Sequence, residues 1–521
     1  MSPQVAIIGS AFHFDVHECF DAFADPDGDP LSFRMEVLGS MPGLVVAGMT
    51  ISGVPTETSS ATVVITADDS RGGTVTNAFY ISMRVNSPPN VANPTGVQIY
   101  AAGTPVDYDP SQGGTTFADF DGHALHYAVH LSDAPAGFQV EDGRVSGTFA
   151  GPGFVRGVIR AEDDFGGVAE EVFRLVVPHP ISATPTLPAT SYVYDDLQLP
   201  LPYLFRISRG QIVPLPDTTP PDNPTTNAGA TLGRVLFYDQ RLSVANTHAC
   251  GSCHRQANGF TIPERFGTGV FGERTRRNPM GLSNVRYSWH NMFFSDLRTS
   301  TLETLALQPI QDPVELASPL PVVISKLAAT DFYPPLFTAA FGSPEVTPER
   351  VAKALAQFLR SILSYQSKFD QAYHGMEVDS PPHPEVLTDL ERRGEQLFRD
   401  SECIECHGTD ATMSDPLNNG LDEVSADPGA LAGQFRAGSL RNIALTAPYM
   451  HDGRFATLRE VIDHYSTGIQ KTGNLHWRLR DGEEPRRFNF SEEDKVALEA
   501  FLNTLTDTSV LQDPKFADPF D

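Results

Sequence analysis

The sequence predicts a multidomain protein in which two all-β sandwich repeats precede two mainly α-helical domains. Three observations lead to this prediction: the chain has 521 residues, its N-terminal part repeats itself at a fixed spacing, and its C-terminal part carries one cysteine motif twice. A chain of this length exceeds an ordinary single domain several-fold. We divide it into β-sandwich repeats at 1–90 and 91–178, a proline-rich linker at 179–229, helical domains at 230–384 and 385–511, and a tail at 512–521.

An internal repeat defines the two N-terminal domains. Three segments recur 94 positions downstream (23 to 117, 51 to 145 and 67 to 161). They are Phe23-Ala-Asp-Pro-Asp-Gly-Asp-Pro-Leu with Phe117-Ala-Asp-Phe-Asp-Gly-His-Ala-Leu, Ile51-Ser-Gly with Val145-Ser-Gly, and Ala67-Asp-Asp-Ser-Arg-Gly-Gly with Ala161-Glu-Asp-Asp-Phe-Gly-Gly. One offset held across three matches indicates a duplicated domain. Alternating strands at 61–66, 79–85 and 172–177, with Gly, Pro and Asp turns between them, are typical of β-sandwiches.

The aspartate-rich turns of the repeats resemble those of cadherin-like and immunoglobulin-like bacterial surface modules, in which aspartates can bind calcium. In the first repeat, Asp25, Asp27, Asp68 and Asp69 would either bind calcium or cap their own turns. In the second repeat we favour turn capping, because His123 replaces the residue that corresponds to Asp29. We expect the repeats to act as spacers or as surfaces that dock a protein or a cell surface.

Helical periodicity begins after the linker, whose apolar part at 192–205 is expected to lie against a neighbouring domain. Helices are predicted at 230–238, 348–363, 387–398 and 491–502. Thr347 and Ser491 are plausible N-caps, because a hydroxyl side chain accepts a hydrogen bond from the first turn.

Two Cys-x-x-Cys-His motifs carry the chemistry of the helical region. They are Cys250-Gly-Ser-Cys253-His254 and Cys403-Ile-Glu-Cys406-His407. The pattern is typical of covalent c-type haem, in which two thiols add to the vinyl groups and the histidine ligates the iron. A bare Cys-x-x-Cys also occurs in redox dithiols and zinc sites, but no further Cys/His pair follows either copy at finger-like spacing. We therefore predict two haems and two cytochrome c-type domains.

Composition limits the partners and the location. A net charge of −28 with a pI near 4.8 argues against nucleic-acid binding; it serves solubility or attracts a basic electron carrier. No apolar run approaches the ~20 residues of a membrane helix. No signal peptide is visible, yet c-type haem is assembled outside the bacterial cytoplasm, so we expect a periplasmic, secreted or cell-surface protein whose leader was removed, or a fragment. Cys19 is expected to be a small buried hydrophobe rather than a reactive thiol.

Residues 218–510 resemble the bacterial dihaem cytochrome c peroxidases, a family that includes the MauG-like enzymes that mature methylamine dehydrogenase. Besides the two haem motifs, the resemblance rests on four segments. They are Leu232-Gly-Arg-Val-Leu-Phe-Tyr-Asp-Gln-Arg-Leu-Ser, Arg277-Asn278, Pro309-Ile-Gln-Asp-Pro-Val-Glu315 and Ser439-Leu-Arg-Asn-Ile-Ala-Leu-Thr-Ala-Pro-Tyr-Met-His-Asp-Gly. The resemblance implies that the haem on His254 reacts with hydrogen peroxide and that the haem on His407 handles electrons.

The resemblance also implies further site residues. Glu315 takes the place of the distal acid/base carboxylate, which moves protons as the O–O bond breaks; the alternative is a surface-loop glutamate. Asn278, Thr446 and Pro448 match the positions that bind calcium between the haem domains; a structural role without metal is the alternative.

Three departures from the family pattern bear on the chemistry. Residues 266–276 contain no distal histidine, so the first haem would be open to substrate. Tyr465 stands where a methionine usually ligates the second haem, as in the maturation enzyme; Met450, His451 or water are the alternatives. Ser295 replaces the usual tryptophan between the haems, and Phe293, Phe294 or Trp289 are candidates to fill that space.

The expected function is reduction of hydrogen peroxide with electrons from a small cytochrome, a cupredoxin or another donor. A MauG-like oxidation of a protein or organic substrate is the alternative within the same chemistry. A non-enzymatic electron-transfer or surface-binding protein is the competing class, and it predicts two haems that each carry two strong ligands.

Overall fold

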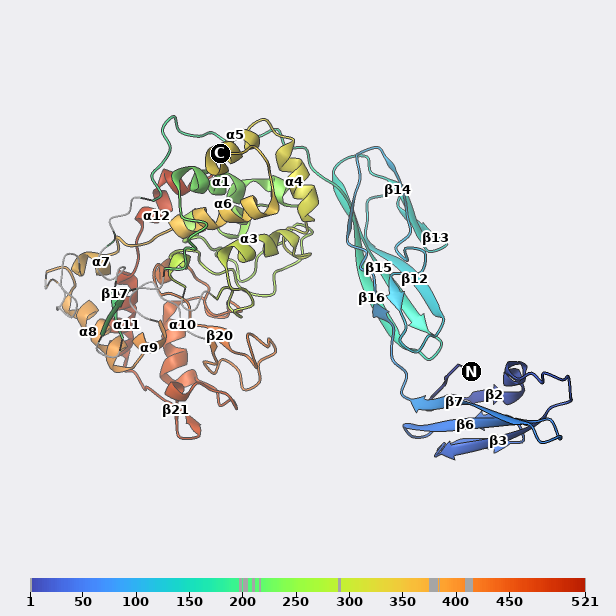
Figure 1. The fold of residues 1–521 in the computed structure, drawn as a ribbon. Helices are drawn as coiled ribbons and strands as arrows, with labels where there is room; N and C mark the ends of the chain where they lie inside the picture. Colours follow the sequence, from blue (N-terminus) through green and yellow to red (C-terminus); the bar gives the residue numbers. More distant parts are fainter. Residues whose placement is uncertain are drawn as a thin grey trace. The chain divides into compact units, whose positions relative to one another are not determined.

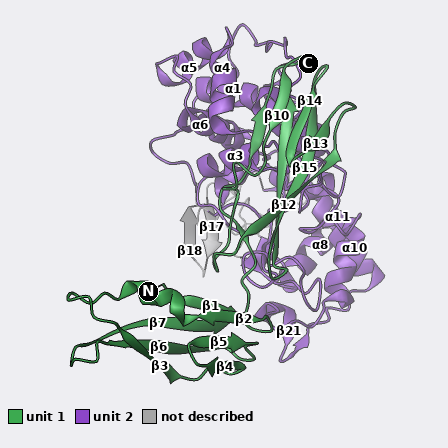
Figure 2. Cartoon of the chain, turned by 90° about the vertical axis from the view of Figure 1, so that its right-hand side faces the viewer, with its two compact units in different colours: residues 1–177 green, residues 178–521 purple. Residues whose placement is uncertain are grey.

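The computed structural model describes residues 2–195, 199, 205–208, 211–214, 217–288, 292–373, 383, 385–407 and 416–520. The chain forms two compact units, residues 1–177 and 178–521, called unit 1 and unit 2 below (Figure 2). Unit 1 is built from strands and unit 2 mainly from helices (Figure 1). The predicted fold class, β-rich domains followed by helical ones, is confirmed.

The first half of unit 1 packs a four-stranded sheet against a three-stranded one. The larger sheet has the order β1 (Gln4–Ile7), β7 (Thr74–Arg84), β6 (Ser59–Asp68), β3 (Ser32–Gly39), and the smaller has β2 (Phe12–Asp15), β5 (Thr50–Gly53), β4 (Leu44–Ala47). Alternate residues such as Val63 and Ile65 point into the core, as period-2 patterning requires. Cys19, on a 3-10 turn, packs half-buried against this core.

The second half of unit 1 repeats this topology. Its larger sheet has the order β12 (Leu125–Asp133), β15 (Gly153–Asp163), β16 (Val168–Val177), β9 (Val97–Ile99), and its smaller sheet has β10 (Pro105–Tyr108), β14 (Arg144–Thr148), β13 (Gln139–Glu141). A two-stranded ladder joins β8 (Asn90–Val91) to β11 (Phe117–Ala118). In both larger sheets the strand that comes first in the chain pairs in parallel with the strand that comes last, β1 with β7 and β9 with β16.

The segment expected to be a linker contains ordered structure. A hairpin joins β17 (Phe205–Ser208) to β18 (Gln211–Pro214). Tyr194 is buried in the helical core, and its hydroxyl donates to the carbonyl of Lys515 at 2.8 Å. The apolar stretch at 192–205 therefore packs on unit 2 at Tyr194, and most of its remainder lies outside the described residues.

Unit 2 places its helices around two attachment motifs. The first set is α1 (Asn227–Tyr238), α2 (Cys250–Cys253), α3 (Leu302–Gln311), α4 (Leu320–Ala328), α5 (Tyr333–Phe341) and α6 (Pro348–Ser361). The second set is α7 (Lys368–Ala372), α8 (Asp389–Asp400), α9 (Ile404–His407), α10 (Leu458–Asp463) and α11 (Glu492–Thr504). The last helix, α12 (Ser509–Gln512), packs back on the first set through Val510. Four two-residue strands complete unit 2: β19 (Pro416–Leu417), β20 (Phe435–Arg436), β21 (Arg480–Asp481) and β22 (Glu484–Pro485). Thr347 caps α6 and Ser491 caps α11, as predicted.

One helix crossing occurs twice in unit 2. A Cβ added to Gly233 of α1 would lie 2.0 Å from the carbonyl oxygen of Ala354 in α6. A Cβ added to Gly394 of α8 would lie 1.9 Å from the carbonyl oxygen of Ala497 in α11. Glycine is needed at both positions because the backbones meet there. In each half the helix that carries this glycine precedes an attachment motif.

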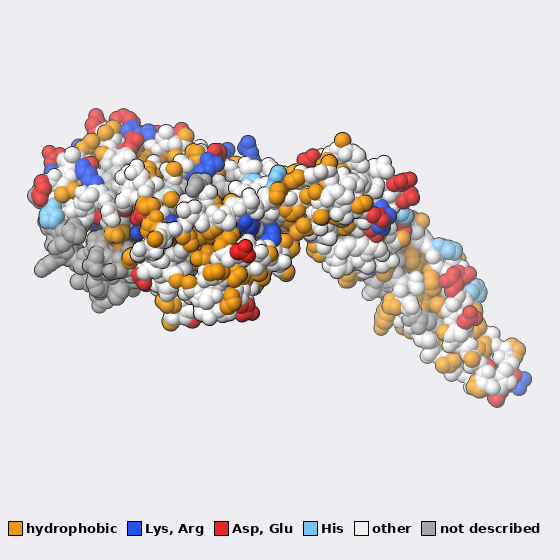
Figure 3. Space-filling model, turned by 90° about the horizontal axis from the view of Figure 1, so that it is seen from above, with side chains coloured by type: hydrophobic (Ala, Val, Ile, Leu, Met, Phe, Trp, Pro, Cys, Tyr) orange, Lys and Arg blue, Asp and Glu red, His pale blue; other side chains and the backbone are white. Residues whose placement is uncertain are grey.

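The helices and the surface side chains bear on where the protein can lie and what it can bind. Among the described residues, no helix has both the length and the apolar character needed to cross a bilayer. On the face of the molecule shown in Figure 3, acidic side chains are scattered and do not gather into one large patch.

Candidate functional site

The first attachment motif opens onto a cavity of about 80 Å³ in the first set of helices. Cys250, Cys253 and His254 line it together with Glu315. The ring of His254 is fixed by a 2.9 Å hydrogen bond from Nδ1 to the carbonyl oxygen of Phe260. Since a carbonyl only accepts, Nδ1 carries the proton, and Nε2 keeps the lone pair that an iron ligand needs. The sequence-predicted residues of the first haem are thus brought together around one cavity.

Glu315 lies on the wall of this cavity, in the turn that follows α3. Its backbone carbonyl accepts a hydrogen bond from Val270 at 2.9 Å, and its own N–H donates to the carbonyl of Asp312 at 3.1 Å. Burial raises the pKa of the Glu315 carboxyl to about 7, and the negative charge of Asp312 adds to the shift. A carboxyl group with this pKa can both accept and return a proton near neutral pH.

The second attachment motif opens onto a larger cavity of about 320 Å³. Cys403, Cys406 and His407 line it. Nδ1 of His407 lies 3.2 Å from the carbonyl oxygen of Gly438, which repeats the arrangement of His254. Burial lowers the pKa of both histidines, which favours the neutral imidazole that binds iron.

Tyr465 lies in the wall of the larger cavity, in a π-helical turn (His464–Gly468) that continues α10. Asn419 donates to the Tyr465 hydroxyl at 3.5 Å, and the same amide lies 3.6 Å from the sulfur of Met450. Burial raises the pKa of Tyr465 to about 12. Tyr465 and Met450 therefore both remain in place as candidate sixth ligands. His451 also lines this cavity, where its ring stacks on Phe435 at 3.7 Å.

The four motif cysteines fit covalent haem. None of them forms a disulfide, and all four are half-buried at the cavity walls. Burial raises the pKa of the Cys250 and Cys403 thiols to about 12. Each pair sits beside a histidine with a fixed ring and an apolar cavity, which is the donor set that a c-type haem requires.

The three residues matched to a calcium site also line the larger cavity. Asn278, Thr446 and Pro448 belong to it, although Asn278 is far from the other two in sequence. The N–H of Asn278 donates to the carbonyl of His451 at 2.8 Å, and its side-chain amide donates to that of Arg265 at 3.1 Å. The Thr446 hydroxyl donates to the Ile443 carbonyl at 3.2 Å.

The region expected to lie between the haems holds charged residues. Ser295 lines the larger cavity. Beside it, the Arg277 guanidinium pairs with Asp296 at 2.5 Å and Asp427 at 2.7 Å. Phe293 is buried in the core of the first helix set, and Trp289 lies outside the described residues.

Two lining residues were missed by the sequence analysis. His248 borders the smaller cavity, with Nδ1 2.9 Å from the hydroxyl of Thr247. In the larger cavity, the side-chain amide of Asn419 contacts both the Tyr465 hydroxyl and the Met450 sulfur. Both lie in loops, so no periodicity marked them.

Comparison with known proteins agrees with this geometry. Residues 227–378 match the family model described as di-haem cytochrome c peroxidase. The chain is 31% identical over 308 residues to the methylamine utilization protein MauG of Methylophilus methylotrophus, covering 56% of this chain and 86% of MauG. It is 31% identical over 291 residues to the cytochrome c551 peroxidase of Nitrosomonas europaea, covering 53% of this chain and 79% of that enzyme.

A solved structure of a MauG-like protein is also similar to this chain. A MauG-like protein associated with microbial copper homeostasis is 32% identical, with a TM-score of 0.52, over 59% of this chain and 97% of that protein. The motifs, the paired cavities and these relatives together show that this chain belongs to the di-haem cytochrome c peroxidase and MauG family.

Proposed function

We propose that this protein is a dihaem c-type oxidoreductase that reduces hydrogen peroxide to water at the first centre. One observation carries the proposal: the Glu315 carboxyl lines the same cavity as Cys250, Cys253 and His254, with its pKa raised to about 7. Electrons would come through the second centre from a small donor protein, a cytochrome c or a cupredoxin, or from another donor.

Each residue of the first centre has a defined task. Cys250 and Cys253 would hold the haem, and Nε2 of His254 would hold its iron, which exchanges electrons with peroxide when the haem is bound. The Glu315 carboxylate would accept a proton from the oxygen of peroxide that approaches the iron and return it to the departing oxygen. The overall reaction takes up two electrons and two protons and yields two molecules of water.

A MauG-like oxidation of a protein or organic substrate is the second candidate. Tyr465 in the wall of the second cavity favours it, because an anionic oxygen ligand stabilises ferric iron and makes this centre a poor electron entry. The 31% identity to MauG from Methylophilus methylotrophus supports it as well. In this reaction the substrate itself supplies the two electrons.

The test is the Glu315→Gln variant, which keeps the size of the side chain and removes the carboxylate. We expect kcat/KM for peroxide to fall about 10²- to 10⁴-fold, with an unchanged haem content. Glu345→Gln is the matched control, because Glu345 is 68% exposed in a loop away from the cavity. Turnover equal to wild type in Glu315→Gln would remove Glu315 from the mechanism. Assays with a cytochrome, a cupredoxin and oxidisable protein substrates separate the two candidates.

Three further assignments complete the proposal. Asn278, Thr446 and Pro448 would bind one calcium ion through an amide oxygen and two backbone carbonyls; removal of calcium by a chelator should then alter the haem spectra. The β-sandwiches would dock a protein or a surface. The chain would work in the periplasm or outside the cell, where c-type haem is attached.

A further inference from the structure

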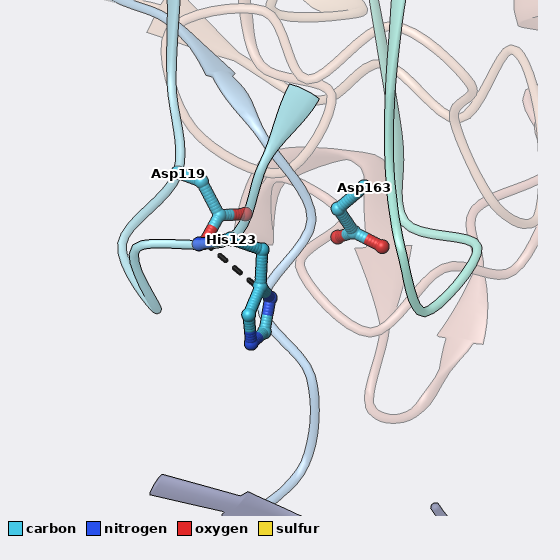
Figure 4. Close-up of side chains that lie close together, drawn as sticks. All are labelled: Asp119, His123 and Asp163. Carbon is cyan, nitrogen blue, oxygen red and sulfur yellow. Dashed lines mark hydrogen bonds and ion pairs between the residues drawn. The ribbon is translucent and has the colours of Figure 1, made fainter. Parts of the chain in front are cut away.

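We propose that the second β-sandwich holds a divalent transition-metal ion, with zinc as the best match, between Asp119, His123 and Asp163. Asp119 and His123 lie in the turn between β11 and β12, and Asp163 ends β15. One oxygen of each carboxyl group and one nitrogen of the imidazole lie within 4.8 Å of one another. Figure 4 shows the three side chains around a common gap.

Two of these side chains have buried atoms without a hydrogen bond. The side chain of Asp119 is only 2% exposed, and its Oδ1 accepts from the N–H groups of Asp121 (2.8 Å) and His123 (3.0 Å). Its Oδ2 is buried without a hydrogen bond. Nδ1 of His123 is also buried without a hydrogen bond, and it lies at ion-pair distance, 3.6 Å, from Oδ1 of Asp119. A buried carboxylate oxygen and a buried imidazole nitrogen are each costly when neither a hydrogen bond nor a bound cation satisfies them.

The peptide that connects the two sandwiches closes over this site. Asn86, between β7 and β8, donates to Oδ2 of Asp163 at 2.8 Å, and its own Oδ1 is buried without a hydrogen bond. Asp163 is 3% exposed, and its Oδ1 accepts from Phe165 and Gly167, both at 2.8 Å. Asn86 thus offers a further oxygen beside Asp163, and a bound ion would fasten the connecting peptide to the second sandwich.

In the first sandwich an arginine lies beside the corresponding turn. Asp25, Asp29 and Asp69 occupy the corresponding positions, 94 residues upstream of Asp119, His123 and Asp163. There Asp29 forms an ion pair with Arg71 at 3.1 Å.

In the second sandwich Phe165 replaces that arginine, and its ring lies 4.4 Å from the ring of His123. The guanidinium that the first turn supplies is therefore missing from this position. The neighbouring arginine, Arg84, pairs with Asp121 instead, and the other Asp121 oxygen accepts from Ser87 at 2.8 Å.

The donor set favours zinc over calcium. Calcium takes about six to eight oxygen ligands, whereas an imidazole nitrogen with carboxylate oxygens is typical of zinc. Bonds of about 2.1 Å in a tetrahedral zinc site place ligand atoms about 3.4 Å apart. The distance of 3.6 Å between Oδ1 of Asp119 and Nδ1 of His123 is close to this value. This donor set therefore differs from the all-oxygen calcium site that was one of the two alternatives for the first repeat.

Zinc binding to the full haem-loaded chain tests the proposal. After treatment with a chelator, the protein is titrated with Zn²⁺, and bound zinc is measured by elemental analysis against haem iron. We expect one zinc per chain in wild type and at least about 100-fold weaker binding in His123→Ala. His126→Ala is the matched control, because His126 forms a comparable 2.9 Å pair with Asp164 but is 71% exposed. It should bind zinc as wild type does.

A second variant and a spectroscopic readout keep the test independent of folding. Asp119→Asn retains the shape of the side chain and should lose zinc as well. Zinc-edge X-ray absorption should show one imidazole among oxygen ligands in wild type. Absence of zinc from wild type, wild-type affinity in His123→Ala, or displacement of the zinc by an equal concentration of calcium would overturn the proposal. Peroxide turnover does not enter these outcomes.

Discussion

The two cavities of unit 2 that hold the attachment motifs share one arrangement of helices and histidines. They differ in the other side chains that line them. Each motif follows a helix whose glycine packs against a partner helix, Gly233 on α6 and Gly394 on α11. Each histidine is held through Nδ1 by a backbone carbonyl. The remaining wall holds a carboxyl group, Glu315, in the smaller cavity, and Tyr465 with Met450 in the larger.

We infer that the shared helices and histidines would hold each haem, whereas the side chains on the remaining wall would determine the reaction at that haem. Burial raises the pKa of Glu315 to about 7, whereas it raises that of Tyr465 to about 12. A group that titrates near neutrality can move protons during turnover. A phenol that stays protonated until high pH can act as an anionic iron ligand only if the iron itself displaces the phenol proton. Under the proposed function, the smaller cavity would carry the substrate chemistry and the larger would hold or pass electrons.

Removing one pair of attachment cysteines should have the largest effect. Cys250→Ala/Cys253→Ala should lose one of the two haems and all peroxide reduction, because the Glu315 wall then faces no iron. Cys403→Ala/Cys406→Ala should also lose one haem but keep a single reaction with peroxide in the reduced protein. Haem content and stopped-flow absorbance measure both. Identical behaviour of the two double variants would contradict the division of tasks.

The pH dependence of the peroxide reaction should separate the cavities next. The Glu315 carboxylate accepts the proton, so the active form is the ionised one. With a pKa of about 7, kcat/KM should fall about tenfold for each pH unit below 7 and level off above it. In Glu315→Gln this slope should disappear, whereas Glu345→Gln should retain it. A wild-type profile that is flat between pH 5 and 8 would exclude a titrating Glu315.

The glycine crossings test whether the two arrangements of helices are equivalent. Gly233→Ala and Gly394→Ala each force a methyl group onto a backbone carbonyl, so each should cost about 1–3 kcal/mol of stability. Thermal melts of the haem-loaded protein measure this as similar losses in Tm. Gly473→Ala is the control, since a Cβ there meets no atom within 4 Å and Gly473 does not line either cavity. A loss confined to one of the two crossings would show that the halves are not built alike.

Much of the fold could be predicted because its signals are local. The β-repeats were predictable because three segments recur at one constant offset. The starts of two helices were predictable because the hydroxyl groups of Thr347 and Ser491 cap them. The motif cysteines and their histidines lie within five residues of each other, so their proximity needed no tertiary structure. Glu315 entered only through resemblance to a family, because its place beside His254 depends on the packing of the turn after α3.

The features that the sequence could not provide depend on distant segments. Asn419 reaches Tyr465 and Met450 from a separate loop, and no pattern in its surroundings marks it. The burial of Tyr194 agrees with the expectation that the apolar part of the linker packs against a domain, but its partner, the C-terminal segment near Lys515, is far away in the sequence. In the second sandwich we favoured turn capping because His123 breaks the aspartate pattern, and the N–H groups that Asp119 and Asp163 accept confirm the capping. The buried nitrogen of His123, which has no hydrogen bond, becomes visible only with Asp119 and Asp163 in place.

Substitution of the candidate sixth ligands should have the smallest effect on the peroxide reaction, because these residues line the other cavity. Tyr465→Phe should change the low-spin spectrum of the second haem if the phenolate oxygen ligates the iron. Met450→Leu should leave that spectrum unchanged and serves as the matched control, since Met450 contacts the same Asn419 amide. The single reaction of the reduced protein with peroxide should stay within a few-fold of wild type in both variants. If Met450→Leu shifts the spectrum and Tyr465→Phe does not, methionine is the ligand, and the second centre is an ordinary electron entry that favours peroxide removal over MauG-like oxidation.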